Sequence, residues 1–372
     1  MKNRVLTTIV CVFIAIVLAT GGCLTLVTVL RNSRAVVVCG NVTADEGTVR
    51  YLASYYKMLY IRSLRTAGVD AEDSESFWSS FAEDGRTYGE LYTTAFNNYL
   101  ASILAGANIY LTYSHYSAED KLRVAETTEE ILKYKADGSV DLFNEMAEDL
   151  GFDYHDFQNA AALIYKARHA EEVIYGTSGE NLKNYPELCN EYLGTYSHVS
   201  LIFIRLNGDM TDEERAKKQA QIDLLTNAMA AAENGENGGI TKVMFNEQLA
   251  LSDGDPAMYE TGYYFHPSAE KTAEFADPFP EVVNASLEME IGEYRRVDCS
   301  VGVWFIYKDE PVAGDYDKSI AFFSDFYADA ALYQYDKVLS ELIPTVTYRP
   351  SYSEIDILAI PTVNEFYIRE FK

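Results

Sequence analysis

Positive charge is scarce in this sequence of 372 residues. Lys and Arg together number 30 against 57 Asp and Glu, so the formal net charge is −27. No run rich in Lys or Arg occurs beyond the N-terminus. Because phosphate binding requires clustered positive charge, we expect no nucleic acid among the partners.

Cysteine and histidine are also few. Two of the five cysteines, Cys11 and Cys23, lie in an apolar N-terminal run, and the other three form no CxxC pair: Cys39, Cys189 and Cys299. The five histidines form neither an HExxH motif nor a short-spaced pair. These spacings predict no metal site. One disulfide stays open as an alternative, although no spacing supports it.

Motifs that bind nucleotides or carry a nucleophilic serine are missing. The sequence has no GxSxG, no GxGxxG and no GxxxxGK followed by Ser or Thr. Hydrolase, dinucleotide-binding and P-loop functions therefore have no support, and we expect no cofactor.

Apolar and tyrosine residues, by contrast, are plentiful. Apolar types make up 48% of the chain, which is enough for a sizeable core and, by length, for two or three domains. There are 29 tyrosines against 2 tryptophans. Tyrosine suits surfaces that touch other chains, but it also suits a half-wet helical core, and both interpretations stay open.

The first 34 residues have the character of a membrane anchor. Lys2 and Arg4 precede an uncharged stretch, Val5 to Leu30, which as a helix is about 39 Å long and crosses a bilayer. Arg31 and Arg34 follow it, whereas a cleaved signal has a shorter apolar region of about 7–15 residues. We therefore expect an uncleaved transmembrane helix that tethers the chain to the cell membrane.

A lipid anchor is the alternative. Residues Ala19 to Cys23 are similar to a bacterial lipoprotein cleavage site, although Thr20 stands where leucine is expected. Lipidation at Cys23 would leave the apolar residues Leu24 to Leu30 in the mature chain. Positive residues flank both ends of the apolar run, so charge leaves the orientation open.

Residues 35–195 are predicted to be mainly helical. A strand at Ala35–Cys39 and a turn at Gly40–Val42 precede a helix that opens at Thr43. Apolar residues at helical spacing predict further helices at about 88–113, 118–135, 139–150, 153–175 and 184–194.

The pattern changes to α+β over residues 196–312. The run VSLIFIRL, Val199 to Leu206, predicts a strand, and a helix that follows Thr211 runs to about Glu233. Then come a helix at 240–251, a strand at 262–265, a short helix at 279–287 and two strands within 294–307. This order is typical of a compact α+β domain.

Beyond this module, a helix is predicted over 315–342 and ends before Pro344. Residues 345–348 and 355–360 are predicted to be extended. The tail from Thr362 is expected to be either poorly ordered or a strand that binds a partner.

Four landmarks in the α+β module occur in a characteristic order. They are Tyr196 to Ile204, Phe245 to Pro256, Thr261 to Phe265, and Phe279 to Leu287 with a following Ile291-Gly292-Glu293. In this order they resemble the landmarks of a parvulin-type peptidyl-prolyl isomerase domain. On the N-terminal side of the module, Val38–Glu46 and Leu150–Phe157 resemble segments of the PrsA/SurA-type extracytoplasmic foldases.

The resemblance covers nearly the whole chain and implies an architecture. A parvulin-like four-stranded antiparallel sheet with helices, residues 196–312, would be inserted in a mainly α-helical SurA-N-like chaperone domain formed by 35–195 and 313–372. It also implies that the bulk of the chain lies outside the cytoplasm and binds unfolded or exported polypeptides. A homodimer is compatible with it.

The resemblance locates an active site, and this sequence departs from it. Active parvulins carry two histidines on adjacent central strands, and those positions fall on Leu201 and Trp304 here. Loss of one member of a hydrogen-bonded pair leaves the other unsatisfied, whereas loss of both can be nearly neutral. We interpret Leu201 and Trp304 as one change from a polar network to core packing.

Other positions of the family's site are retained. Its aromatic pair maps onto Phe275 and Phe279, and the resemblance predicts that Tyr264 or Phe265 lines the same pocket. The catalytic acid or thiol position maps onto Asp255, with Asp253 as the alternative. Turn formation through Asx chemistry is an equal explanation for both acids.

Three functions follow. The first is a membrane-tethered folding factor that binds unfolded or proline-containing segments of exported proteins, mostly through tyrosine-rich helical surfaces, and whose isomerase domain is degenerate. The second is an active peptidyl-prolyl cis-trans isomerase with an altered site. The third is a non-enzymatic envelope assembly or structural protein. The loss of both histidines favours the first.

Overall fold

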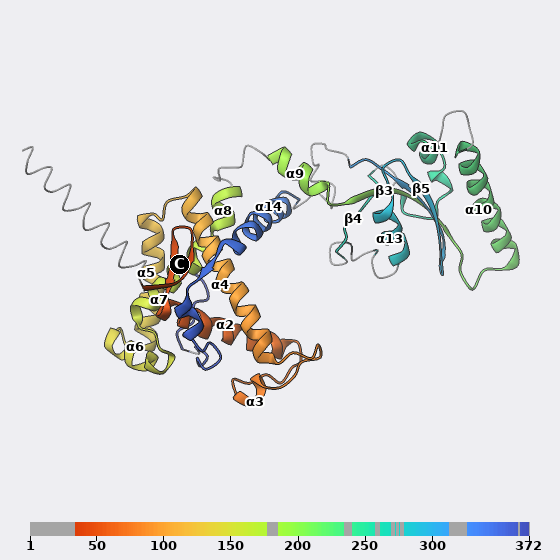
Figure 1. Ribbon diagram of the computed structural model, residues 1–372. Helices are drawn as coiled ribbons and strands as arrows, with labels where there is room; N and C mark the ends of the chain where they lie inside the picture. Colours follow the sequence, from red (N-terminus) through yellow and green to blue (C-terminus); the bar gives the residue numbers. More distant parts are fainter. Residues whose placement is uncertain are drawn as a thin grey trace, which may run out of the picture. The chain divides into compact units, whose positions relative to one another are not determined.

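The chain divides into two compact units. The computed structural model describes residues 34–176, 185–233, 240–256, 261–268, 272, 275, 279–311, 326–363 and 365–371. Unit 1 comprises residues 1–183 and 335–372, and unit 2 comprises residues 184–334, so unit 2 interrupts unit 1 in the sequence (Figure 1). The predicted transmembrane stretch lies outside the described residues. No helix within the described ranges has the length and apolar character needed to span a membrane.

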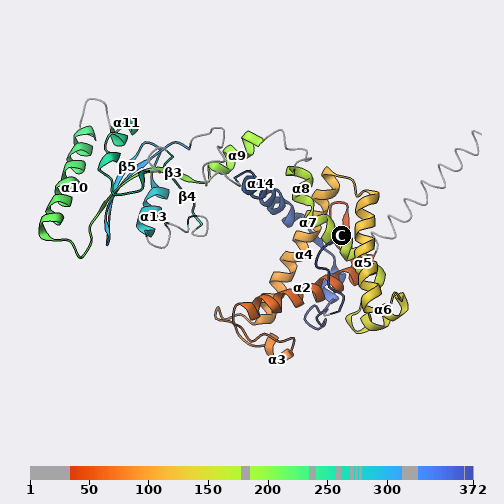
Figure 2. The same ribbon diagram turned by 180° about the vertical axis from the view of Figure 1, so that it is seen from behind.

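Unit 1 combines a small antiparallel sheet with packed helices (Figure 2). Its strand order is β2–β1–β7, formed by β1 (Ala35–Cys39), β2 (Val42–Asp45) and β7 (Thr347–Tyr348). Its helices are α2 (Glu46–Thr66), α3 (Glu75–Trp78), α4 (Tyr88–Tyr113), α5 (Ala118–Lys135), α6 (Val140–Ala147), α7 (Tyr154–Arg168) and α8 (Ala170–Tyr175). Its short 3-10 turns are Glu148–Leu150, Ile343–Thr345 and Pro350–Glu354. Helices α2 and α4 both pack on α7.

The start of the first helix differs from the prediction. Thr43 and Ala44, expected to open the helix, belong to strand β2, because Ala44 pairs with Val37 of β1. Helix α2 begins at Glu46, and the Asp45 side chain caps it by accepting a hydrogen bond from the Thr48 amide at 3.0 Å. The predicted helices at 139–150 and 153–175 are each divided, into α6 with a 3-10 turn and into α7 with α8.

The predictions for the C-terminal segment were wrong. Residues 355–360 form turns instead of an extended strand. The tail beyond Thr362 is neither poorly ordered nor an edge strand: Val363, Phe366 and Ile368 are 1%, 2% and 0% exposed in the core of unit 1. The Phe366 ring lies 4.1 Å from the ring of Phe143 on α6.

Side chains of α2 form hydrogen bonds with the main chain of residues 358–368, which belong to the C-terminal segment, residues 355–371. Four of them donate hydrogen bonds to its carbonyls: Tyr51 to Phe366 (2.9 Å), Ser54 to Pro361 (2.5 Å), Tyr55 to Ile368 (3.1 Å), and Lys57 to Leu358 and Ile360 (2.8 and 2.9 Å). Buried carbonyls must be paired, and here side-chain donors take the place of a neighbouring strand.

Lys57 is the most costly of these groups to bury. Its side chain is 1% exposed, and its ammonium forms an ion pair with Asp73 at 2.7 Å. The ammonium also lies 5.0 Å from the centre of the Trp78 ring. A buried cation is tolerated when each of its donors has a partner, and Asp73 with the two carbonyls provides three. Lys57 thus joins α2, the region of α3 and the C-terminal segment.

Replacement of Lys57 by Met is therefore expected to lower the free energy of unfolding of unit 1 by about 3–5 kcal/mol, because it leaves Asp73 and two buried carbonyls short of a donor. Urea unfolding measures the loss. Hydrogen exchange at residues 363–368 should accelerate as well.

Lys135→Met is the matched control, since Lys135 forms an ion pair with Glu365 of the same segment at 2.7 Å, with side chains 42% and 57% exposed. Loss of this exposed pair should cost less than about 1 kcal/mol. Equal effects of the two substitutions would show that Lys57 does not hold the segment.

Three carboxylates meet where α2 and α7 begin. Asp45 caps α2, Asp153 caps α7, and the Asp156 side chain accepts a hydrogen bond from the Asp153 amide at 3.0 Å. Asp156 also lies directly on Gly47, where an added Cβ would stand 2.0 Å from its Oδ2. Burial, assisted by the charges of Asp153 and Asp45, raises the pKa of Asp156 to about 6 from its ordinary 3.8.

A carboxyl with a raised pKa binds its proton more tightly in the folded chain. Its contribution to stability is complete below about pH 4 and is lost as the pH rises through about 6. Asp156→Asn should therefore stabilise unit 1 at pH 7.5 by about 1–2 kcal/mol, allowing for partial exposure, and this gain should vanish at pH 4. Urea unfolding across this range tests it, with exposed Glu145→Gln as the control; a gain independent of pH would contradict the assignment.

Unit 2 contains a four-stranded antiparallel sheet in the order β4–β3–β6–β5. The strands are β3 (Ser197–Arg205), β4 (Tyr263–Phe265), β5 (Tyr294–Cys299) and β6 (Gly302–Lys308). The helices are α9 (Tyr185–Leu193), α10 (Asp212–Glu233), α11 (Lys242–Asn246), α13 (Pro280–Glu288) and α14 (Phe326–Leu342), with a 3-10 turn at Leu249–Leu251. The division between the units falls within α14.

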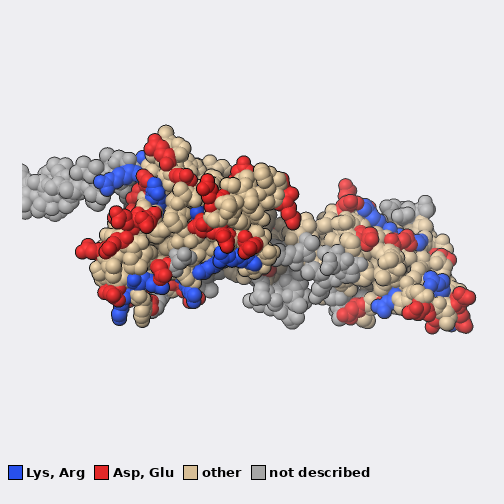
Figure 3. Space-filling view, turned by 90° about the horizontal axis from the view of Figure 1, so that it is seen from below, with Lys and Arg blue, Asp and Glu red and all other residues tan. Residues whose placement is uncertain are grey.

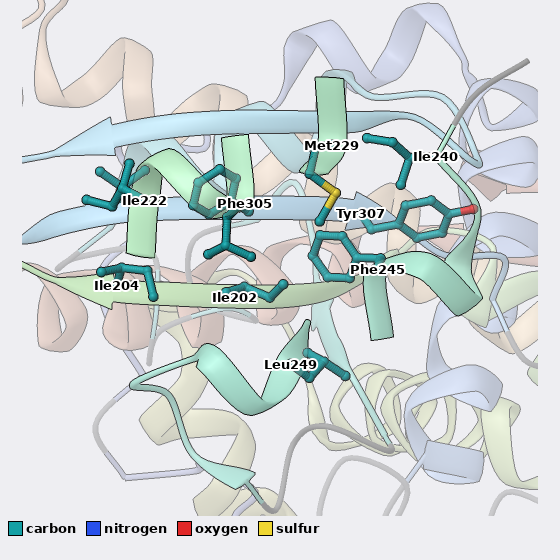
Figure 4. Close-up of a cluster of buried hydrophobic side chains, with 11 residues drawn as sticks. Ile202, Ile204, Ile222, Met229, Ile240, Phe245, Leu249, Phe305 and Tyr307 are labelled. Carbon is teal, nitrogen blue, oxygen red and sulfur yellow. The ribbon is translucent and has the colours of Figure 1, made fainter. Parts of the chain in front are cut away.

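Both faces of this sheet are covered. Helices α10 and α11 pack on one face, over Ile202, Ile204 and Phe305 (Figure 4). Helix α13 packs on the other face, over Leu201 and Trp304. The helix predicted over 240–251 is thus a short helix and a 3-10 turn, and residues 315–325 of the last predicted helix lie outside the described residues.

Candidate functional site

The candidate site lies on the α13 face of the central strand pair. Strands β3 and β6 are antiparallel, with Leu201 opposite Ile306 and Phe203 opposite Trp304. Side chains along a strand alternate between faces, so all four point to the same side. Leu201 and Trp304, the two positions where the parvulin resemblance expects histidines, are thus diagonal neighbours, and each is 5% exposed.

Aromatic rings fill the space over Trp304. Phe203 is stacked on it at 4.1 Å between ring centres and an interplanar angle of 17°. Phe279 and Phe275 lie 5.0 and 6.0 Å from the Trp304 ring and 5.8 Å from each other. Phe265 adjoins Phe275 at 5.3 Å. The structure therefore brings together Leu201, Trp304, Phe265, Phe275 and Phe279, which we call the aromatic cluster together with Phe203.

Tyr264 does not belong to this cluster. It neighbours Phe265 on β4 and so points to the opposite face, where its ring is stacked on His198 at 4.3 Å and 6°. Burial, assisted by the charge of Asp309, raises the pKa of Tyr264 to about 12. Of the two residues predicted to line the pocket, Phe265 is therefore the one placed beside Phe275.

Both ring nitrogens of His198 lie within hydrogen-bond distance of main-chain carbonyl oxygens. Its Nδ1 lies 3.0 Å from the carbonyl oxygen of Glu310, and its Nε2 lies 2.9 Å from that of Thr261. The side chain is also on the face opposite Leu201. It cannot replace the histidine that the family carries at the position of Leu201.

The two candidate acids have different places. Asp253 accepts a hydrogen bond from the Arg205 amide at 2.9 Å and forms an ion pair with Lys218 at 2.6 Å, so it fastens its turn to β3. Asp255 is exposed, further along the same turn. The assignment of a catalytic role to Asp255 stays a prediction.

The cluster has little polar chemistry to offer. The indole N–H of Trp304 is buried and has no hydrogen-bond partner within the described part of the chain. At the margin, burial raises the pKa of the Cys299 thiol, and the charges of Glu281 and Asp298 raise it further, so this thiol stays protonated at neutral pH. A buried unpaired donor costs about 1–3 kcal/mol, which is the remaining cost of the indole at this position.

Phe203 and Tyr263 are members of the site that sequence reasoning missed. Tyr263 lies 4.9 Å from Phe275, edge to face. Both could have been found from strand parity, because Phe203 shares its face with Leu201 and Tyr263 shares its face with Phe265.

Comparisons with known proteins give weak matches. No protein-family model matches this chain, and no curated protein does either. PrsA of Bacillus subtilis is 16% identical over 73% of this chain and 91% of that chain, with a TM-score of 0.22. The peptidylprolyl isomerase PrsA of Bacillus anthracis is 19% identical, over 66% and 95%, with a TM-score of 0.23. The foldase protein PrsA of Streptococcus pneumoniae is 13% identical, over 77% and 95%, with a TM-score of 0.19. Similarity at this level does not establish a family.

We expect Trp304 to be replaceable, because its indole N–H finds no acceptor among the described residues. In Trp304→Phe the lost packing is offset by removal of a buried unsatisfied donor, so the free energy of unfolding of unit 2 should change by less than about 1 kcal/mol. Urea unfolding followed by circular dichroism measures it.

Trp78→Phe, in unit 1, is the matched substitution, because the Trp78 indole N–H donates to Asp73 at 2.9 Å. Loss of a hydrogen bond to a charged acceptor should cost about 1.5–3 kcal/mol. A larger cost for Trp304→Phe than for Trp78→Phe would mean that the Trp304 indole has a partner.

Proposed function

We propose that this protein is a membrane-tethered, extracytoplasmic folding factor that binds unfolded or proline-containing segments of exported proteins, and that its isomerase-like unit no longer catalyses. The observation that carries the proposal is the aromatic cluster. It occupies the place where the parvulin resemblance requires two histidines.

The physical demands of isomerisation support a loss of catalysis. Rotation about an X–Pro bond has a barrier of about 18–20 kcal/mol, and an isomerase lowers it by holding the proline ring while stabilising the twisted amide. In the cluster, Phe275 and Phe279 pack on Trp304. Both rings are partly buried in these contacts, which takes part of their apolar surface away from a proline ring, and the buried Trp304 indole N–H has no hydrogen-bond partner among the described residues.

Polypeptide binding is then assigned to other surfaces. The tyrosine-rich helices contribute less surface than the sequence suggested, since Tyr51, Tyr92 and Tyr192 are fully buried. Tyr113 and Tyr134, 42% and 72% exposed on α4 and α5, remain available. Exposed aromatic side chains of this kind contribute strongly to contacts between chains.

The membrane tether is proposed from the sequence alone. Lys2 and Arg4, the uncharged stretch Val5–Leu30, and the following Arg31 and Arg34 support a transmembrane segment. Intact-mass measurement of the membrane-extracted chain distinguishes this anchor from lipidation at Cys23.

Two assays on the full chain in lipid nanodiscs test the proposal. We expect the protein to suppress aggregation of an unfolded client and to leave the isomerisation rate of a proline tetrapeptide at the uncatalysed value. Phe279→Ala should not change the suppression. Phe245→Ala is the matched control, because Phe245 is 0% exposed on the other face of the sheet and reports destabilisation alone.

Turnover that Phe279→Ala abolishes and Phe245→Ala retains would instead establish an active isomerase with an altered site. Absence of both activities would exclude a folding factor and favour the assembly or structural protein.

A further inference from the structure

Unit 1 contains a cleft with a volume of about 950 Å³. It lies between the middle of α2 at Lys57, the region of α3, the first turns of α4 and residues 356–361. Its apolar lining includes Trp78, Leu358 and Pro361. The volume is in the range of small-ligand sites, about 300–1,000 Å³, and would admit a few residues of extended polypeptide.

The cleft is acidic. Four carboxylates line it, Asp73, Glu75, Glu90 and Asp356, against one ammonium, Lys57, so the formal charge of the lining is 1 − 4 = −3. The Lys57 ammonium has no donor left for a ligand, because Asp73 and two carbonyls already accept from it. Acidic side chains also spread widely over the face of the molecule seen from below, where Lys and Arg gather in fewer places (Figure 3).

Three of the four carboxylates already accept hydrogen bonds from the protein. Asp73 accepts hydrogen bonds from Trp78 and Thr362, Glu90 accepts from the Thr87 amide, and Asp356 accepts from the amides of Leu358 and Ala359. The fourth, Glu75, is exposed, and its carboxylate forms no hydrogen bond or ion pair with the described residues. Glu75 is therefore the carboxylate of the cleft that is open to a new partner.

The ligand that fits is an organic cation on an apolar stem. Anions are repelled by the lining, and among the described residues no group of three or more His, Cys, Asp or Glu could hold a metal ion. Arg and Lys side chains combine an aliphatic stem, which suits Leu358 and Pro361, with a cationic head, which suits a free carboxylate. We propose that this cleft binds Arg- or Lys-bearing segments of client polypeptides, with Glu75 as the contact for the charged group; this rests on the proposed function.

Trp78 supplies a direct readout. In the Trp304→Phe background it is the remaining tryptophan of the chain, and it lines the cleft. The full chain is titrated with an octapeptide of alternating Ala and Arg and with one of alternating Ala and Glu. We expect saturable change of Trp78 emission with the Arg peptide alone, and weaker binding as salt is raised.

Glu75→Gln should weaken binding of the Arg peptide by about two- to fivefold, the range of an exposed ion pair. Glu126→Gln removes an exposed carboxylate from α5 that does not line the cleft. This substitution should leave the affinity for the Arg peptide unchanged. Equal binding of both peptides, or equal effects of both substitutions, would overturn the proposal.

Aggregation assays separate this proposal from the function it rests on. Suppression that is stronger for a basic client than for an acidic one, and that Glu75→Gln reduces, supports both. Suppression that is independent of client charge overturns the cleft's role and retains the folding factor. Binding of the Arg peptide without any suppression overturns the folding factor and leaves a peptide site.

Discussion

The register of β3 against β6 determines the whole candidate site. Because side chains alternate along a strand, the pairing of Phe203 with Trp304 places both, with Leu201, against α13. Both faces of the sheet are apolar, so hydrophobicity alone does little to prevent β3 from slipping by one residue against β6. Gly302, opposite Arg205, adds the constraint: its φ is 151°, and an added Cβ would lie 2.2 Å from the Ile204 carbonyl oxygen. Only glycine permits this close approach of the two strands.

The surroundings of Lys57 and the aromatic cluster differ in how they treat buried polar groups. In unit 1, Lys57 is retained deep in the structure because every donor meets an acceptor. The aromatic cluster of unit 2 consists of apolar side chains, and the indole N–H of Trp304 has no acceptor among the residues that the structure describes. A half-complete polar network is less stable than either a complete one or none. The difference explains how Leu201 and Trp304, at the positions where the parvulin resemblance expects histidines, are compatible with an ordered sheet.

Sequence patterns predicted those parts of the fold that depend on local signals. Helix α4 was predicted at its observed bounds from apolar periodicity, which is a local feature, and the structure adds a Thr87–Glu90 capping box at its start. Leu201 and Trp304 were assigned to one packed face, which the strand register explains. The C-terminal segment was mispredicted because its partners, Tyr51, Ser54, Tyr55 and Lys57, lie some 300 residues away and bind main-chain carbonyls, which carry no sequence signature. The role of Asp255 and the expected module ends at 196 and 312 stay predictions.

The discontinuity of unit 1 has a consequence for the order of folding. Residues 184–334 leave the ribosome before residues 355–371, and the sheet of unit 2 draws its strands from that earlier stretch alone. The side chains of Tyr51, Tyr55 and Lys57 on α2 therefore lack their carbonyl acceptors in residues 358–368 while the whole of unit 2 is synthesised. A nascent chain in this state exposes aromatic and cationic groups together, and contacts between distant segments form late. Docking of residues 355–371 then completes unit 1, which makes it a late step in the folding of the chain.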